Sequence, residues 1–371
     1  MTIENEVLVY VGTYTEHPAG GGGSKGIYVT RLDVTTGRLG ELTLAAELDN
    51  PSFVAVSPDA KFLYAVSEVG VREAGGEPTG FVHAYAIGAD GALTPLNRVA
   101  SGGADPCHIN VSRDGRTVAV ANYTGGSVAF IKRSLDGSLG DATMDHHSGH
   151  GPRADRQKAA HAHSVDFSPD DMTLFSCDLG ADRVFLYRAG KMPADVRSSV
   201  ALEPGSGPRH LALHPSGRYA YVIAELSNSV AAFAWNASAG TLRQMQTIST
   251  LPFGYTAPSN TAEIVVHPSG RFVYGSNRGH DSIASFSVDA KTGRLIRLGN
   301  TPTGGKAPRS FAIDPSGRWL LAANQLSDSI VIFAIDQRTG AITPTGATAA
   351  LPRPVCVLFV PTTSSTTTPA R

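Results

Sequence analysis

The segment HAHSVDFSPD (161–170) holds two histidines, His161 and His163, separated by one residue at the start of an apolar run. Residues two apart on a β-strand point to the same side, so the pair can face one ligand or one reacting group. Histidine titrates near neutral pH and can act as a general base, and its neutral imidazole also binds zinc. The pair therefore predicts either acid–base chemistry or a metal site.

Three more histidines, His146, His147 and His150, stand in the preceding segment DHHSGHGPR (145–153). A zinc site needs three or four ligands within tetrahedral reach, and these residues match no established ligand spacing. We favour a loop, residues 146–158, that folds over a site and donates polar contacts to it. We accordingly expect no metal and no other cofactor.

The residues after His163 belong to a pattern that recurs along the chain: a strand end, a four-residue turn and a new apolar strand. In each turn, Pro favours the first corner and Asp or Gly tolerates the later positions. The copies are about 51 residues apart, a period typical of β-propellers. They are SPDAKFLYAVSE from Ser57, SRDGRTVAVANY from Ser112, SPDDMTLFSCDL from Ser168, HPSGRYAYVIAE from His214, HPSGRFVYGSNR from His267 and DPSGRWLLAANQ from Asp314.

Each copy continues into a third apolar strand and, in most units, into a DG-x-L or TG-x-L hairpin, as at Asp90–Leu93 and Thr292–Leu295. This pattern gives four antiparallel strands per unit. VLVYVGTY (7–14) and PVCVLFVP (354–361) resemble two strands of one further unit. We predict an all-β fold, a seven-bladed β-propeller closed by N- and C-terminal segments that share one blade, because closure removes exposed sheet edges.

Composition limits the other possibilities. Lys and Arg (31) nearly balance Asp and Glu (32), which argues against nucleic acid or an anionic membrane as a partner. No apolar run is long enough to cross a membrane, and no signal peptide is evident. Three cysteines cannot all pair with one another, so we expect buried thiols in a cytoplasmic protein. We expect one propeller domain over residues 1–361 and a disordered tail over 362–371.

In a propeller, the residues before each innermost strand and after each second strand gather at one mouth of the central channel. The repeat places Ser52, Cys107, His163, Arg209, Ala262 and Arg309 at the first of these positions. It places Glu68, Asn122, Asp178, Glu225, Arg278 and Gln325 at the second. A scaffold needs no such variety of charged residues at equivalent positions, so these departures from the repeat indicate function.

Several long motifs stand out along the chain: NYTGGSV (122–128), HAHSVDFSPD (161–170), DLGADRV (178–184), GPRHLALHPSGRYAYVIAELSN (207–228), AEIVVHPSGRFVYGSNRGHDSI (262–283) and APRSFAIDPSGRWLLAANQLSDSI (307–330). With these motifs, residues 7–361 resemble the seven-bladed β-propeller lactonase family. That family includes propeller-type 6-phosphogluconolactonases and, more distantly, a fungal enzyme that lactonises carboxy-muconate. The resemblance implies a lactone hydrolase that opens a sugar-acid lactone, with 6-phospho-D-glucono-1,5-lactone of the pentose phosphate pathway as the expected substrate.

The resemblance also implies a catalytic group made of His163, Arg209, Glu225 and Arg278. A histidine base contributes roughly 10²–10⁴ in rate, and arginines bind anionic substrate groups and the developing oxyanion. Glu225 either orients an arginine or takes the role of the base, and the sequence leaves this open. Neighbouring residues expected to bind substrate are His161, His108, Asn122 and His210.

Two other functions fit the same residues. A muconate-type cycloisomerase would use the arginines for carboxylates and an acid–base residue for ring closure. A non-catalytic binding scaffold would lack converging His, Arg and Glu side chains at the channel mouth. We expect a phosphorylated sugar lactone as the small-molecule partner, and a monomer or homodimer that binds neither nucleic acid nor membrane.

Overall fold

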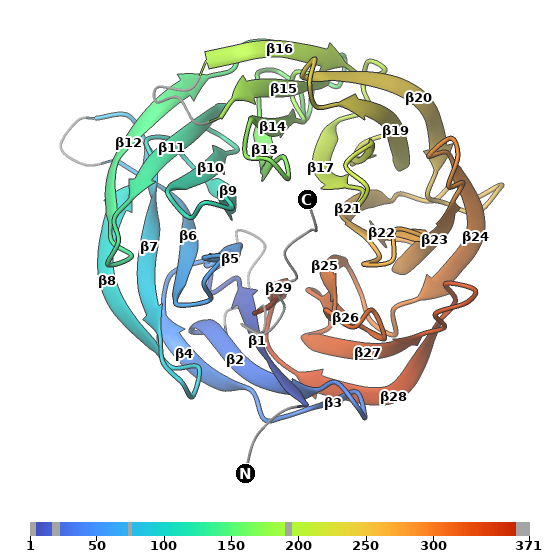
Figure 1. Ribbon diagram of the computed structural model, residues 1–371, viewed down its shortest axis with the longest axis horizontal. Coiled ribbons are helices and arrows are strands. Elements are labelled where there is room, and N and C mark those ends of the chain that lie inside the picture. The colour runs from blue at the N-terminus through green and yellow to red at the C-terminus, as the bar shows by residue number, and fades with distance from the viewer. Residues whose placement is uncertain (1–4, 17–22, 73–75, 190–194, 361–371) are drawn as a thin grey trace.

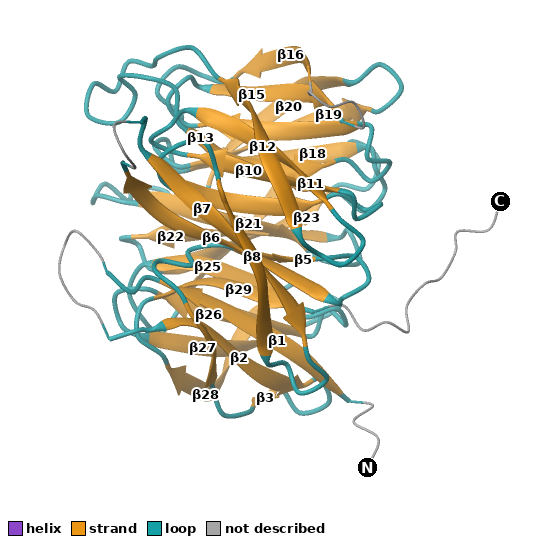
Figure 2. Ribbon diagram, turned by 90° about the vertical axis from the view of Figure 1, so that its left-hand side faces the viewer, coloured by secondary structure: helices purple, strands orange, loops and turns teal. Residues whose placement is uncertain are grey.

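The chain is described by a computed structural model for residues 5–16, 23–72, 76–189 and 195–360, where all regular secondary structure is β-strand (Figure 2). Figure 1 shows the strands arranged in blades around a central axis. The predicted seven-bladed β-propeller is therefore confirmed. Within the described ranges no helix is long and apolar enough to cross a membrane. The tail expected at 362–371 lies outside the described residues.

Six blades are four-stranded antiparallel sheets in which the strands follow one another in chain order, with the first strand innermost (Figure 1). Their strands are β5 (Val54–Val56), β6 (Phe62–Val71), β7 (Thr79–Ile87), β8 (Leu93–Ala100), β9 (Pro106–Val111), β10 (Thr117–Asn122), β11 (Ser127–Arg133), β12 (Leu139–His146), β13 (Ala162–Phe167), β14 (Thr173–Asp178), β15 (Arg183–Arg188), β16 (Asp195–Ala201), β17 (Pro208–Leu213), β18 (Tyr219–Ala224), β19 (Ser229–Asn236), β20 (Thr241–Ser249), β21 (Asn260–Val266), β22 (Phe272–Arg278), β23 (Ser282–Val288), β24 (Leu295–Pro302), β25 (Pro308–Ile313), β26 (Trp319–Asn324), β27 (Ser329–Ile335) and β28 (Ile342–Ala350).

The seventh blade joins the two ends of the chain. The innermost strand is β29 (Pro354–Phe359), and it pairs with β1 (Glu6–Thr13) in antiparallel register, with Val9 opposite Phe359. The blade continues with β2 (Gly26–Asp33), and both β3 (Arg38–Leu39) and β4 (Thr43–Glu47) pair with β2. The predicted closure is confirmed, because β29 and β1 share one sheet (Figure 1).

Neighbouring blades are held together by apolar packing and by a repeated hydrogen bond. The hydroxyl of Tyr221 donates to Gly293 O at 2.9 Å, and that of Tyr274 donates to Gly340 O at 2.8 Å. Both glycines sit in outer hairpin turns with positive φ, 71° and 74°, which favours glycine. A Cβ on Gly293 would also lie 2.4 Å from the Tyr219 ring. The TG-x-L turn expected at Gly293 is thus part of the contact between blades.

The innermost strands share a bulge close to the channel mouth. In five blades one residue is skipped where this strand pairs with the end of the second strand: Cys107, His163, Arg209, Arg309 and Val355. A bulged residue leaves the regular ladder, and its side chain takes a new direction. The fold therefore releases His163 and Arg209 from the sheet at equivalent places in adjacent blades.

Candidate active site

Four residues predicted to be catalytic lie together at one mouth of the channel. His163 and Arg209 occupy the bulges of β13 and β17, Glu225 directly follows β18, and Arg278 ends β22. Oε2 of Glu225 accepts a hydrogen bond from Arg209 Nε at 3.0 Å and forms an ion pair with Arg278 Nη2 at 2.9 Å. His163 Nε2 lies 3.9 Å from the same oxygen. The mouth therefore has the converging His, Arg and Glu side chains that a pure scaffold would lack.

A third arginine, Arg156, reaches the same carboxylate from the loop before β13. Its Nη2 donates to Glu225 Oε1 at 2.8 Å and to Tyr123 Oη at 3.1 Å. The buried Gln157 anchors the loop by donating to Leu179 O at 2.8 Å. The loop predicted to fold over the site does contact it. Arg156 itself was not predicted, because this loop has no counterpart in the other repeats. We call Glu225, Arg156, Arg209, Arg278 and His163 the Glu225 cluster.

Charge in the Glu225 cluster favours an anionic ligand. Burial alone would raise the pKa of Glu225, but Arg278, Arg209 and Arg156 outweigh it and lower the pKa to about 2. Burial lowers the pKa of Arg278 to about 10, which still leaves the guanidinium charged at neutral pH. Three positive charges therefore face one negative charge, and the excess positive charge can attract a carboxylate, phosphate or oxyanion.

His163 is held in its neutral form. The side chain is buried, and burial, reinforced by Arg209 and His210, lowers the pKa of His163 well below 6.5. Among the described residues, Nε2 has no hydrogen-bond partner, so in the tautomer that carries its proton on Nδ1 this nitrogen is free to accept a proton. Cys107 Sγ lies 3.8 Å from Nδ1, but burial raises the pKa of the Cys107 thiol well above 9.0. Cys107 is therefore a protonated neighbour of the imidazole and not an activated nucleophile.

Three other predicted histidines surround the cluster at different depths. His161 is half-buried at the rim, where it stacks on Tyr123 with ring centroids 4.6 Å apart and donates through Nδ1 to Tyr123 O at 3.0 Å. His108 and His210 are buried and line a channel cavity of about 350 Å³, together with Glu263. His161 therefore lies where a substrate can touch it, whereas His108 and His210 lie beneath the cluster.

Asn122 is not brought to the cluster. It is fully buried within its blade, and its Nδ2 donates to Ser101 O at 3.1 Å and Ser127 Oγ at 3.2 Å. Asn277 has matching bonds in another blade, which indicates a structural position of the repeat. The residue equivalent to Glu225 is Tyr123, one position later. Asn122 is therefore left out of the proposed site, and Tyr123 takes its place.

The opposite half of the mouth holds a second polar group that was not predicted. Arg309, in the bulge of β25, donates through Nη2 to Tyr14 Oη at 2.9 Å. Tyr14 Oη lies 2.9 Å and 3.0 Å from the two carboxylate oxygens of Glu68. The repeat had placed Arg309 and Glu68 at mouth positions. Tyr14 was not predicted, although it directly follows β1 as Glu225 directly follows β18.

The histidines considered as metal ligands have other partners or lie apart. His147 Nδ1 lies 2.7 Å from Asp178 Oδ2, and its Nε2 lies 2.7 Å from Tyr187 Oη. His146 and His150 are exposed. In the described part of the chain, no three His, Cys, Asp or Glu residues are grouped so that they could hold a metal ion.

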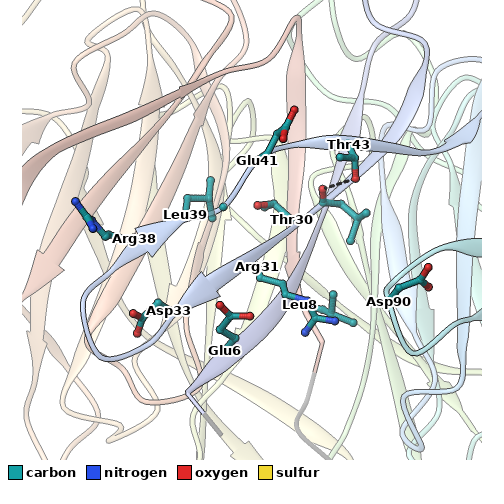
Figure 3. Close-up of a pocket in the computed structure, with 12 residues that line it drawn as sticks. Glu6, Leu8, Thr30, Arg31, Asp33, Arg38, Leu39, Glu41, Thr43 and Asp90 are labelled. Carbon is teal, nitrogen blue, oxygen red and sulfur yellow. Dashed lines mark hydrogen bonds between the residues drawn. The ribbon is translucent and has the colours of Figure 1, made fainter. Parts of the chain in front are cut away.

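A second hollow, of about 420 Å³, lies on the outer side of the closing blade, around β2 and β3. Figure 3 shows that acidic and basic side chains, including Glu6, Arg31, Asp33 and Asp90, are spread along it and point in different directions. This hollow lacks the convergence seen around Glu225.

Comparisons with known proteins agree with the fold. The family model described as "Lactonase, 7-bladed beta-propeller" matches residues 8–359. The 6-phosphogluconolactonase of Bacillus subtilis is 39% identical over 353 residues, covering 95% of this chain and 97% of that protein. The solved structure of a periplasmic gluconolactonase from Pseudomonas aeruginosa superposes with a TM-score of 0.85 at 35% identity, covering 96% of this chain and 99% of that chain. The protein therefore belongs to the seven-bladed β-propeller lactonase family.

Proposed function

We propose that this protein hydrolyses a sugar-acid lactone and that its substrate is 6-phospho-D-glucono-1,5-lactone. The observation that carries this proposal is the Glu225 cluster, in which a neutral imidazole stands beside three guanidinium groups that share one carboxylate. Relatives named 6-phosphogluconolactonase in Bacillus subtilis and in Formosa agariphila, 39% and 36% identical, support the choice of substrate.

In the proposed reaction, His163 accepts a proton from water through Nε2 as the water oxygen forms a bond to the lactone carbonyl carbon. Arg209 and Arg278 stabilise the negative charge that develops on the carbonyl oxygen. The bond between the carbonyl carbon and the ring oxygen then breaks, and His163 returns its proton to that ring oxygen. The products are a free hydroxyl group and a carboxylic acid, which ionises.

Glu225 and His163 are the two candidates for the base, and they differ in charge at neutral pH. A carboxylate with a pKa of about 2 is a very weak base at neutral pH, and Glu225 already accepts two hydrogen bonds from arginines and forms an ion pair with a third. His163 is neutral and buried at the same place. We therefore assign the base to His163 and propose that Glu225 orients the arginines.

An unphosphorylated gluconolactone is the second candidate substrate, because the Pseudomonas aeruginosa relative is described as a gluconolactonase. That relative is also described as periplasmic. We nevertheless propose a cytoplasmic location for this protein, since its three cysteines are free and buried. We further propose that residues 1–361 act as one domain, as a monomer or homodimer, without nucleic acid or membrane partners.

The test is a turnover screen of the purified protein. Acid release would be followed with 6-phosphogluconolactone and with glucono-1,5-lactone, each corrected for spontaneous hydrolysis, and muconate would be followed by its ultraviolet absorbance. We expect the fastest turnover with the phosphorylated lactone and none with muconate. Turnover of muconate alone would replace the hydrolase with a cycloisomerase, and no turnover of any of the three would contradict the proposal.

A further inference from the structure

Arg309 and Arg209 occupy equivalent places in their blades but differ in their partners. Each is the bulged residue of an innermost strand. In the blade of Arg209, the residue after the second strand is Glu225, which binds Arg209 Nε at 3.0 Å. In the blade of Arg309, the equivalent residue is Gln325, which carries no charge. Among the described residues, no carboxylate forms an ion pair with Arg309.

Tyr14 holds Arg309 in place. The guanidinium carbon lies 5.2 Å from the centre of the Tyr14 ring, and Nη2 donates to the hydroxyl oxygen at 2.9 Å. Burial raises the pKa of Tyr14, so the hydroxyl stays protonated and donates to Glu68. Glu68 therefore holds the Tyr14 side chain in place, and Tyr14 in turn orients the guanidinium of Arg309. Nε and Nη1 of Arg309 have no hydrogen-bond partner among the described residues.

The two polar groups lie on opposite halves of one mouth. The Glu225 cluster and Tyr123 come from the blades of β9–β12, β13–β16, β17–β20 and β21–β24. Arg309, Tyr14 and Glu68 come from the blades of β25–β28, β29–β3 and β5–β8, which complete the ring in Figure 1. Arg309 is nevertheless near enough to lower the pKa of His163 and of Arg209. A ligand seated on the Glu225 cluster would thus extend toward Arg309.

We propose that Arg309, held by Tyr14, binds a second anionic group of the substrate, at the end remote from the lactone carbonyl. In 6-phosphogluconolactone this group is the phosphate. A guanidinium presents a planar fork of donors that matches phosphate oxygens, and Arg309 has donors left for such a group. This inference rests on the proposed function, and it makes Arg309 the residue that separates phosphorylated from unphosphorylated lactones.

The experiment compares Arg309→Gln with the unaltered protein on both lactones. Loss of a charge-assisted hydrogen-bonding group should raise KM for 6-phosphogluconolactone roughly 10- to 100-fold. KM for glucono-1,5-lactone should stay within about twofold, because that substrate has no second anion. Arg309→Lys should recover part of the loss. Arg318→Gln is the matched control, because Arg318 is an exposed arginine of the same blade. This variant should leave KM unchanged for both lactones.

A binding measurement tests the role of Arg309 independently of turnover. In calorimetric titrations, 6-phosphogluconate should bind the unaltered protein more tightly than gluconate, and Arg309→Gln should remove that difference. Equal losses on both lactones, or an unchanged preference for 6-phosphogluconate, would overturn the role of Arg309. If the unaltered protein hydrolysed neither lactone, the proposed function would fail, whereas a phosphate-dependent binding difference lost in Arg309→Gln would still support the anion site.

Discussion

Arg209 Nη1 lies 2.9 Å from His210 Nε2, and because arginine can only donate, this contact fixes the protonation of the histidine. Nε2 of neutral His210 must accept, so its proton resides on Nδ1, which lies 2.8 Å from Glu263 Oε1 and donates to it. A continuous chain of hydrogen bonds therefore runs from Glu225 through Arg209 and His210 to Glu263, from the channel mouth into the channel cavity.

Glu263 is expected to act on turnover through this chain. Glu263→Ala removes the acceptor for His210 Nδ1, so His210 is no longer held in the form that accepts a hydrogen bond from Arg209, and kcat/KM should fall roughly tenfold. Glu263→Gln keeps an acceptor oxygen and should retain most of the activity. Burial raises the pKa of Glu263 to about 7, so a pH profile of the unaltered protein should contain an ionisation near 7 that Glu263→Gln lacks. Equal losses in both variants would mean that Glu263 only supports folding.

Glu225 is expected to stabilise the fold above acid pH. Its folded pKa of about 2 is lower than the ordinary 4.5, so its contribution is complete above 4.5 and is lost as pH falls toward 2. This shift corresponds to roughly 3 kcal/mol. Glu225→Gln should lower the melting temperature at pH 7 and reduce its decline between pH 4.5 and pH 2. Glu41→Gln, at an exposed site, should change neither the melting temperature at pH 7 nor its decline between pH 4.5 and pH 2. Identical acid profiles for Glu225→Gln and the unaltered protein would contradict this role.

Arg156 is expected to matter although it lies on a loop. Arg156→Gln removes one of three positive charges around Glu225 and one donor to Tyr123, so kcat/KM should fall roughly 10- to 100-fold. Arg153→Gln is the matched control, since Arg153 is exposed on the same loop and its backbone, not its side chain, bonds Gln157. Steady-state kinetics of both variants would decide the matter, and similar effects of the two changes would count against a specific role for Arg156.

The fold and most of the Glu225 cluster were predictable because the copies of the repeat can be aligned with one another within this one sequence. The turn motif recurs at nearly constant spacing, so equivalent positions such as those of Arg209 and Arg309 can be compared from the sequence alone. The positions given for Asn122 and Asp178 were each one residue too early, because a buried structural position directly precedes the mouth position in every blade. Counting from Ser112 as from His214 would have given Tyr123.

Other contacts could not be derived from the repeat. Arg156 comes from a loop without counterparts, and its direction depends on how the buried Gln157 anchors that loop. The pairing of Arg309 with Tyr14 joins residues close to opposite ends of the chain, and it exists only because β29 and β1 close the ring. The depth of His108 and His210 below the cluster follows from the bulges, which direct one residue to the mouth and leave the next in the channel.

We propose that neutral His163 is the base of a lactone hydrolase, and acid release from 6-phosphogluconolactone is the decisive measurement. The unaltered protein should accelerate release above the spontaneous rate, and the loss of kcat/KM caused by protonation of His163 should come only below pH 6.5, separate from the ionisation near 7 assigned to Glu263. His163→Gln should fold normally and lose roughly 10²- to 10⁴-fold in kcat. Release no faster than in buffer, or a folded His163→Gln variant with undiminished kcat, would contradict the account.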